Sequence, residues 1–315
     1  MIVYEALKKL ETDSQTIGLT IGNFDGMHLG HQSILKHLRE RIGLNGHSVV
    51  MTFSNHPAQI LKPDFSPSFL CSLSQKMRLI KRSGVDSLFI LPFTSDLANL
   101  SPAAFLSMLR NFIPFTHLIL GHDATIGKNR TGTRDHLKQL ADSFSFHLEY
   151  LNEVKHHHEP ISSTIIRSLI KAGDLLKAAA LLGRPYSLYS QIETGRGLGK
   201  TIGFPTLNLN IDQCCLPPLG VYKVRVMLSP DLSLPGIANV GVAPTVRSDS
   251  SPKLEVHLLD PLPQEQLSHL EVVFEKFIRP ERKFDSLEDL RLQIKTDIDF
   301  LKSDQIDHPD ESKGN

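Results

Sequence analysis

The sequence of 315 residues has few cysteines, no excess charge of either sign and no long apolar run. A helix that spans a bilayer needs about 20 consecutive apolar residues, so the sequence predicts no transmembrane segment. The first residues, MIVYEALKKLE, are too charged for a signal peptide. The 34 basic residues balance 34 acidic ones, so no overall basic field would attract nucleic acid or an anionic membrane. We therefore expect neither as a partner.

Only three cysteines occur, Cys71, Cys214 and Cys215, and two of them are adjacent. They cannot form a disulfide framework, and their spacing matches no zinc site. We interpret them as reduced thiols of a cytoplasmic protein. A hydrophobic content of 40% and a charged content of 22% are typical of a globular chain, and the length favours two domains over one.

Short apolar runs alternate with amphipathic segments between residues 17 and 151. This alternation predicts an α/β domain whose parallel sheet has helices on both faces. Two more helices are expected before Gly183-Arg184-Pro185, where the pattern breaks and we place the domain boundary. The expected strands are 17–21, 48–53, 87–91, 117–120 and 146–151, and the expected helices are 32–41, 74–83, 102–112, 134–143, 164–172 and 175–182.

After residue 185 the pattern changes to short alternating runs separated by glycine and proline turns. Such spacing predicts an antiparallel barrel or sandwich, closed by an amphipathic helix over 287–301. The polar tail, 303–315, is expected to be disordered. The expected strands are 189–194, 206–211, 221–228, 237–242, 254–259 and 272–278.

The most informative segment runs from Gly22 to His31, with the sequence GNFDGMHLGH. It follows the first expected strand and precedes a helix, which is where an α/β sheet binds nucleotide phosphate. Neither the Walker lysine spacing nor a GxGxxG fingerprint is present, so an ordinary P-loop or dinucleotide site is excluded. His28 and His31 take the place of lysine as phosphate-facing donors. The alternative is a turn with two solvated histidines.

Two later segments of the first half carry further polar groups. Residues 161–167 (ISSTIIR) bring Ser163 and Thr164 to a helix start, with Arg167 one turn later; alone, this could be an ordinary N-cap with a solvated arginine. Residues 121–132 (GHDATIGKNRTG) follow the fourth expected strand. His56 could line the site or cap a turn. Consecutive histidines at 156–158 are better explained by a solvated loop than by a metal site.

In the second half, residues 195–208 (GRGLGKTIGFPTLN) form a glycine-rich stretch that leads into a strand. Glycines let a backbone bend closely around phosphates, although surface hairpins are also glycine-rich. The strand period of two places Thr206 and Asn208 on one face. The same period places Glu255 and His257 on the polar face of a later strand; alone, Glu255 would be a solvated strand residue.

These motifs, in this order, resemble bacterial bifunctional riboflavin kinase/FAD synthetases over nearly the whole chain. The resemblance implies a Rossmann-like nucleotidylyltransferase domain (1–183), which joins FMN to the AMP part of ATP, and a riboflavin-kinase β-barrel (184–302). It implies ATP, riboflavin and FMN as substrates and Mg²⁺ carried with ATP; the sequence leaves the oligomeric state open. It assigns His28, His31 and Glu255 to catalysis, with Glu255 as the base, Thr206 and Asn208 to the metal, and Asp123 and Arg130 to flavin. It assigns to ATP phosphates Gly22, Asn23, Gly26, Ser163, Thr164, Arg167, Gly195, Gly197 and Gly199.

One loop departs from the family pattern, because Ala124 and Ile126 stand where aromatic residues are usual. This departure predicts weakened FMN binding rather than altered phosphate chemistry. Two other functions are alternatives: a nucleotidylyltransferase acting on another phosphorylated metabolite, and a flavin sensor or RNA-binding module. The kinase-like motifs argue against the first, and the zero net charge argues against the second.

Overall fold

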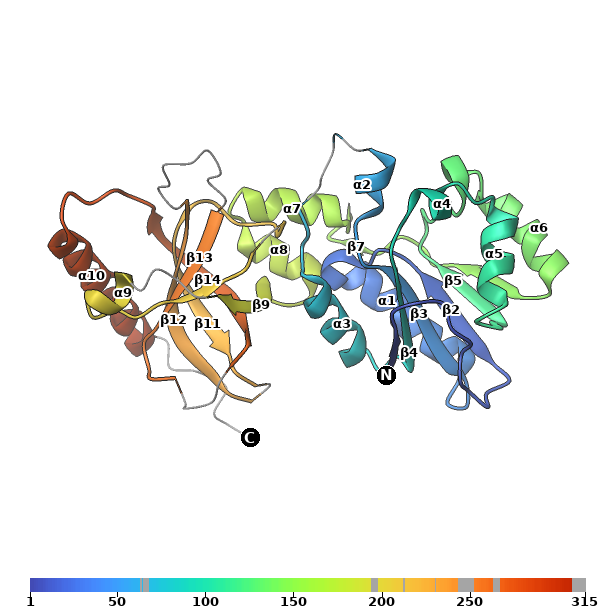
Figure 1. Ribbon diagram of the computed structural model, residues 1–315, viewed down its shortest axis with the longest axis horizontal. Coiled ribbons are helices and arrows are strands. Elements are labelled where there is room, and N and C mark those ends of the chain that lie inside the picture. Colours follow the sequence, from blue (N-terminus) through green and yellow to red (C-terminus); the bar gives the residue numbers. More distant parts are fainter. Residues whose placement is uncertain are drawn as a thin grey trace. The chain divides into compact units, whose positions relative to one another are not determined.

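A computed structural model describes residues 1–62, 64, 68–193, 198–211, 213–229, 231–242, 252–262 and 267–307. The chain divides into two compact units (Figure 1). The first comprises Met1–Ile166 and Leu181–Gly183, and the second comprises Arg167–Ala180 and Arg184–Asn315. Most of helices α7 (Ser163–Lys171) and α8 (Leu175–Leu182) therefore group with the second unit. The predicted boundary at Gly183 stays a prediction.

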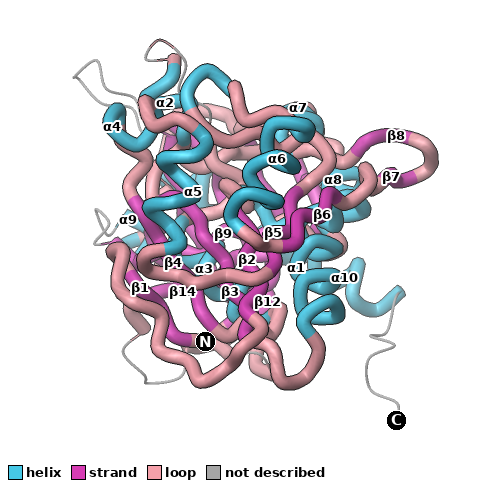
Figure 2. Tube along the Cα trace, turned by 90° about the vertical axis from the view of Figure 1, so that its right-hand side faces the viewer, coloured by secondary structure: helices cyan, strands magenta, loops and turns pink. Residues whose placement is uncertain are grey.

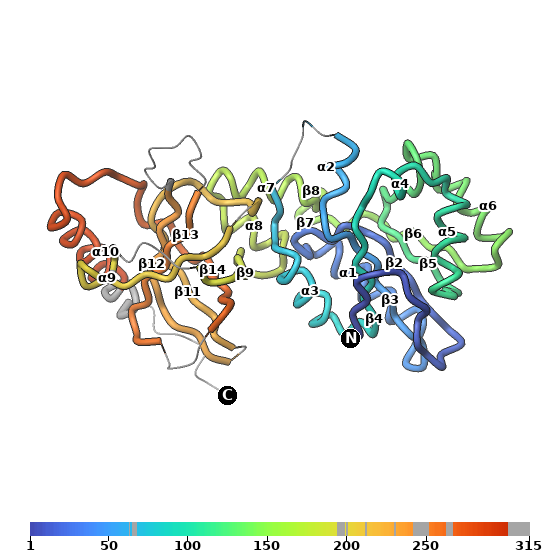
Figure 3. The backbone as a smooth tube through the Cα atoms, in the orientation of Figure 1, coloured from blue at the N-terminus to red at the C-terminus, as the bar shows by residue number. Residues whose placement is uncertain are grey.

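The first unit is built on a six-stranded parallel sheet (Figure 3). The strand order is β1-β4-β3-β2-β5-β6, and all five predicted strands are confirmed. The short edge strand β1 was not predicted. The strands are β1 (Ile2–Tyr4), β2 (Ile17–Ile21), β3 (His47–Phe53), β4 (Ser87–Leu91), β5 (His117–Leu120) and β6 (His147–Tyr150).

Helices cover both faces of this sheet, as predicted. One face carries a buried core with side chains from α5 and α6, among them Phe105 and Leu137. The other face carries a core with side chains from α1 and α3, among them Leu35 and Ile80. The helices are α1 (Leu29–Ile42), α2 (Pro57–Leu61), α3 (Leu73–Arg82), α4 (Ser95–Ala98), α5 (Pro102–Arg110) and α6 (Arg134–Phe144). Two 3₁₀ turns, η1 (Asp25–Met27) and η2 (Lys128–Arg130), follow β2 and β5.

The strand order reverses direction between β2 and β5. From β2 the chain proceeds outward through β3 and β4, and it then returns to place β5 on the opposite side of β2. In an open parallel sheet, the loops on either side of such a reversal separate and leave a crevice at the carboxyl ends of the strands. The segment from Gly22 to His31 follows β2 and therefore lies at this crevice.

The second unit is a closed antiparallel barrel with the strand order β10-β13-β12-β11-β14-β9. Buried and half-buried residues alternate along β13. Leu254 and Val256 are fully buried, whereas Glu255 and His257 are half-buried. Its elements are β9 (Ser187–Glu193), α9 (Leu198–Thr201), β10 (Leu207–Leu209), β11 (Gly220–Met227), β12 (Ser233–Val242), β13 (Pro252–Leu258), β14 (His269–Pro280) and α10 (Leu287–Asp307).

Helix α10 packs on the outside of this barrel. Ile298 and Leu301 form a small core with Val221 of β11 and Ile237 of β12. The helix continues to Asp307, so residues 303–307 are helical rather than part of a disordered tail. Polar residues can continue a helix, and the prediction of disorder from residue 303 rested on polar composition alone. Residues 308–315 lie outside the described residues.

Consecutive histidines at 156–158 lie in a small hairpin of β7 (Lys155–His156) and β8 (Glu159–Pro160), visible in Figure 2. Within the described ranges, no group of three or more His, Cys, Asp or Glu side chains could hold a metal ion. In the same ranges, no helix has both the length and the apolar character needed to cross a bilayer.

Candidate functional site

The turn after β2 has an unusual backbone. Phe24, Gly26 and Met27 all have positive φ, at 50°, 76° and 42°. Gly26 has no room for a side chain, since a Cβ there would lie 2.7 Å from Cδ1 and 2.9 Å from Cβ of the buried Leu70. The carboxylate of Asp25 accepts hydrogen bonds from the backbone N–H groups of Leu70 and Cys71, at 2.9 and 3.3 Å. These contacts hold the turn in one shape at the amino end of α1.

His28 and His31 lie at that helix start with their rings stacked, 3.6 Å between centroids. His28 is the N-cap residue, and its Nδ1 accepts a hydrogen bond from the backbone N–H of His31 at 3.4 Å. Nδ1 of His31 and Oδ1 of Asn23 are buried, and neither has a hydrogen-bond partner among the described residues. Buried polar atoms without partners are costly, so both are candidates to bind a ligand.

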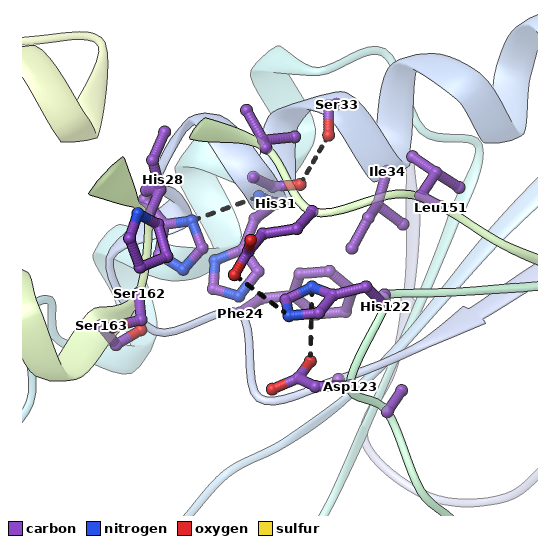
Figure 4. Close-up of a pocket in the computed structure, with 18 of the residues that line it drawn as sticks. Phe24, His28, His31, Ser33, Ile34, His122, Asp123, Leu151, Ser162 and Ser163 are labelled. Carbon is purple, nitrogen blue, oxygen red and sulfur yellow. Dashed lines mark hydrogen bonds and ion pairs between the residues drawn. The ribbon is translucent and has the colours of Figure 1, made fainter. Parts of the chain in front are cut away.

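A cavity of about 490 Å³ opens beside the two histidines (Figure 4). Its walls come from segments that follow β2, β5 and β6, so it occupies the crevice at the strand reversal. The predicted site residues that line it are Gly22, Asn23, His28, His31, Asp123 and Ser163. A volume of this size is in the range of small-molecule sites. The alternative of two solvated histidines is wrong, because His28 is only 6% exposed.

The charge balance of this cavity is unusual for a phosphate site. The described lining residues include no lysine or arginine, and they include Asp123 and Glu153. His122 lies 3.6 Å from a carboxylate oxygen of Glu153 and 3.9 Å from one of Asp123. Burial, followed by the charges of His28 and Lys76, holds the pKa of His31 well below its ordinary value of 6.5. His31 is therefore neutral near pH 7 without an anion, and it would act as a hydrogen-bonding group.

The loop after β5 places the two unusual residues differently. Ala124 lines the cavity, whereas Ile126 is 7% exposed and belongs to the core under α5 and α6. An aromatic residue at 124 could thus reach a ligand, and one at 126 would have to fit the core. Arg130 folds back on its own loop, where Nε donates to Oγ1 of Thr125 at 3.0 Å. The flavin contacts of Asp123 and Arg130 stay predictions.

The start of α7 completes the wall of the cavity. The hydroxyl of Ser163 donates to the backbone carbonyl of Asp25 at 3.0 Å. This bond connects the helix start to the turn after β2, which we call the signature turn. Thr164 and Arg167 lie on the same helix, and Arg167 is the first residue of the second unit. Their phosphate contacts stay predictions. His56 caps α2, since its Nδ1 accepts the N–H of Ala58 at 3.1 Å, and it is absent from the cavity lining described here.

In the second unit, a row of polar residues crosses neighbouring barrel strands. Glu255 on β13 is in register with Asn208 on β10 and with Asn239 on β12. Residues in register point to the same face, so the carboxylate lies between two amide side chains. Glu281 approaches the same end of β12, because its Oε1 and Nδ2 of Asn239 both lie within 3 Å of the position a Cβ would take on Gly241.

The loop before β10 is held against this row. The N–H of Phe204 donates to the carbonyl of Gly199 at 2.8 Å, and Oγ1 of Thr206 lies 3.3 Å from where a Cβ on Gly199 would be. Nδ1 of His257 donates to the carbonyl of Pro205 at 2.8 Å, and its ring packs edge-on against Phe204. The loop thus brings Thr206 to the end of the strand that carries Asn208. Gly195 and Gly197 lie outside the described residues.

The two halves match two families in the same order. The family model described as FAD synthetase matches residues 10–165, and the one described as riboflavin kinase matches residues 182–304. A bifunctional riboflavin kinase/FMN adenylyltransferase from Pseudomonas fluorescens is 36% identical over 300 residues, which cover 95% of this chain and 96% of the relative. This chain belongs to the bifunctional riboflavin kinase/FMN adenylyltransferase family.

Other members agree with this assignment, and one solved structure has a similar fold. The Escherichia coli K12 member is 35% identical over 281 residues, covering 89% of this chain and 90% of the relative. The Listeria monocytogenes member is 33% identical over 282 residues, covering 89% of each. A crystal structure described as a macrolide-efflux protein from Streptococcus pneumoniae has a TM-score of 0.79 and 29% identity, covering 95% of this chain and 98% of that one. That last similarity shows a shared fold.

Several residues at both sites were missed by sequence reasoning. Lys76 was assigned to an ordinary amphipathic helix, yet it is buried beside the signature turn. Lys76 lies three residues after Leu73 and four before Ile80, so the helical period places it on the apolar stripe of α3. This spacing could have predicted that its side chain is buried. Asn239 lies in an expected strand and was given no role, and its register with Glu255 follows only from the strand pairing. Glu281 was likewise given no role from the sequence.

Proposed function

We propose that the cavity of the first unit binds ATP and FMN and transfers the adenylyl group from ATP to FMN, which gives FAD and pyrophosphate. The observation that supports this most directly is the pair of buried, unpartnered atoms, His31 Nδ1 and Asn23 Oδ1, at the amino end of α1 beside a cavity. A helix amino terminus favours an anion, because its backbone N–H groups and its dipole both point toward it.

The chemistry of this transfer fits such a site. The attacking oxygen of FMN is a phosphate oxygen that is already ionised near neutral pH, so no general base is needed. The obstacle is the approach of two anions, and catalysis then rests on position and on neutralisation of charge. A neutral His31 takes up a proton more readily once a phosphate lies beside it, because an adjacent anion raises the pKa of an imidazole. His28 and His31 would stabilise the charge that develops on pyrophosphate.

In the barrel, we propose that Glu255 accepts the proton of the ribityl 5′-hydroxyl while the γ-phosphoryl group of ATP is transferred to that oxygen, which gives FMN and ADP. An alcohol must lose its proton during this reaction, and a carboxylate within reach is the usual acceptor. The position of Glu255 between Asn208 and Asn239, on the outer face of the barrel, supports this role.

The same face could hold a divalent metal that arrives with ATP. Thr206 and Asn208 offer a hydroxyl and an amide oxygen, which are hard ligands suited to Mg²⁺, and Glu255 adds a carboxylate next to Asn208. These donors fit such an ion. When bound, the metal would neutralise charge on the phosphates. The chain itself positions the nucleotide and removes the proton.

A product assay tests both proposals. The purified chain is incubated with riboflavin, ATP and Mg²⁺, and the flavins are separated; both FMN and FAD should form. A flavin sensor would yield neither product, and a transferase for another metabolite would yield no FMN. With FMN supplied in place of riboflavin, the first unit is assayed by itself, so each site has its own readout on one chain.

Paired variants assign the two activities to residues. Replacing His28 and His31 by alanine should abolish FAD formation from FMN and leave the kinase intact. The matched control replaces His117 and His147, another adjacent imidazole pair with centroids 4.8 Å apart. These residues begin β5 and β6, so they lie at the amino ends of the strands, whereas the cavity lies at the carboxyl ends. Unchanged FAD formation in the first variant would contradict the assignment.

For the kinase, Glu255→Gln should remove most FMN formation and spare adenylyl transfer from supplied FMN. Glu275→Gln on β14 is the matched control, because that carboxylate pairs with Arg225 elsewhere on the barrel. Equal loss of both activities in the Glu255 variant would count against its role as a base. The cytoplasmic location and the absence of nucleic-acid and membrane partners remain proposals drawn from composition.

A further inference from the structure

A buried lysine lies behind the signature turn of the first unit. Lys76 of α3 is only 4% exposed, and it is not among the residues that line the cavity. Its Nζ donates to the backbone carbonyl of Asn23 at 3.0 Å, to the carbonyl of Phe53 at 2.9 Å and to Oγ1 of Thr52 at 3.3 Å. An ammonium group has three N–H donors, so these three acceptors use all of them.

The acceptors come from two adjacent strands at the edge where the cavity opens. Asn23 follows β2, and Thr52 and Phe53 end β3. The hydroxyl of Thr52 in turn donates to the carbonyl of Asn23 at 3.1 Å, so it accepts from Lys76 and passes a hydrogen bond on. The backbone of Asn23 is therefore fixed by two donors, while its side-chain Oδ1 stays unpartnered at the cavity.

Lys76 also supplies a fixed positive charge to a cavity whose described walls contain no lysine or arginine. Its charge is among the causes that lower the pKa of His31. The groups that face it are Asp25 and Cys71, which oppose the lowering of its own pKa by burial. Asp25 is itself 2% exposed and is held by backbone N–H groups of the loop that precedes α3.

We propose that Lys76 is a positioning residue for adenylyl transfer: it holds the backbone of Asn23 and places its positive charge behind the cavity wall, without touching either substrate. This inference rests on the proposed function of the first unit. It differs from the assigned phosphate contacts, because Lys76 has no donor left for a ligand and acts through two residues that do line the cavity.

Two variants separate its hydrogen bonds from its charge. Lys76→Met removes both, and Lys76→Gln removes the charge but keeps an N–H donor group. Lys81→Met makes the same replacement at an exposed position on α3 and is the control. We expect Lys76→Met to lower kcat for FAD formation by about 100-fold, the loss that a displacement of about 1 Å can cause at a reacting centre. Kinase activity on the same chain should stay within about twofold of the parent.

A change in protonation distinguishes this role from a structural one. Without the lysine charge, the C2–H resonance of His31, assigned with a His31→Gln variant, should titrate at higher pH in Lys76→Gln than in the parent. The acid limb of the pH profile for FAD formation should shift in the same direction. A structural role would lower activity in Lys76→Met and leave both titrations in place in Lys76→Gln.

Each outcome decides the matter. FAD formation in Lys76→Met equal to that in Lys81→Met overturns the inference, as does an unshifted titration in Lys76→Gln. If Lys76→Met loses its cooperative unfolding transition, FAD formation and the His31 titration in Lys76→Gln provide the test instead. Loss of that transition in both variants also overturns the inference. If the parent chain makes no FAD from FMN, the proposed function itself fails, which the parent assay shows before any variant is compared.

Discussion

Replacing Gly26 by alanine should destabilise the first unit more than the same change at another glycine with a positive φ. Gly26 has a φ of 76°, and a Cβ there would lie 2.7–2.9 Å from the buried side chain of Leu70. Gly43 ends α1 with a φ of 70°, and a Cβ there would meet nothing within 4 Å. The pair compares a positive-φ glycine packed against the core with one that faces open space.

Gly26, with a ψ of −7°, lies near the left-handed helical region, which costs an alanine about 1–2 kcal/mol. Gly43, with a ψ of −177°, lies in the extended positive-φ region, which costs an alanine about 1–3 kcal/mol. Forcing extra volume into a packed core costs a further 1–3 kcal/mol or so, and only Gly26→Ala incurs it. We therefore expect a loss of about 1–3 kcal/mol in the free energy of unfolding for Gly43→Ala and about 2–5 kcal/mol for Gly26→Ala. For a unit of this size, each kcal/mol lowers Tm by about 2–4 °C.

Thermal and urea unfolding of both variants give these differences, and the two activities give an independent readout. Gly26→Ala should also reduce FAD formation, because the displaced turn carries Asn23 and precedes His28. Gly43→Ala should keep it, and both variants should retain the kinase of the barrel. A loss below about 2 kcal/mol for Gly26→Ala would refute the reasoning, since the conformation alone would account for it and the contact with Leu70 would cost nothing.

Three other predictions concern pH, the barrel and the flavin. The folded state holds the pKa of His31 below its ordinary 6.5, so the stability that its neutral form contributes is present above about pH 6.5 and is lost as the pH falls and the unfolded chain takes up a proton. ATP should bind with proton uptake near pH 6, which calorimetry in two buffers of different ionisation enthalpy measures. His31→Gln should abolish both the pH dependence of stability and the proton uptake. Asp297→Ala should destabilise the barrel by about 3–5 kcal/mol in urea, because it leaves Arg279 (Nη2 to Oδ2, 2.8 Å) without its buried partner, whereas the exposed Asp299→Ala should change little. Ala124→Phe should lower KM for FMN in adenylyl transfer about 2–10-fold through ring stacking, worth about 0.5–1.5 kcal/mol, and an unchanged KM would show that this wall does not meet the flavin.

Much of the fold could be predicted from the sequence, because the period of its apolar residues differs between the two halves. The strands from β2 to β6 are short apolar runs between amphipathic segments, and Ile17–Ile21 is reproduced to the residue. The edge strand β1 was missed, since three residues with two exposed side chains give no periodic signal. The helical start of the tail was missed because a polar segment can be helical when its helix is already anchored by Ile298 and Leu301.

The candidate site was predictable only where residues lie close together in the sequence. His28 and His31 share one helix start, so their motif indicated their neighbourhood directly. Contacts between distant segments required the structure: Lys76 meets the carbonyl of Asn23 from 53 positions away. The protonation of His31 could not be predicted either, because it depends on burial and on charges contributed by other elements.

The register of β13 decides which of its side chains face the barrel interior. A slip of one residue would exchange Leu254 and Glu255 between the barrel interior and its outer face. Such a chain would place a carboxylate among aliphatic side chains and would not persist. A surviving molecule therefore carries its acid in the correct place, and misassembly should appear in a preparation as missing protein rather than as an inactive fraction.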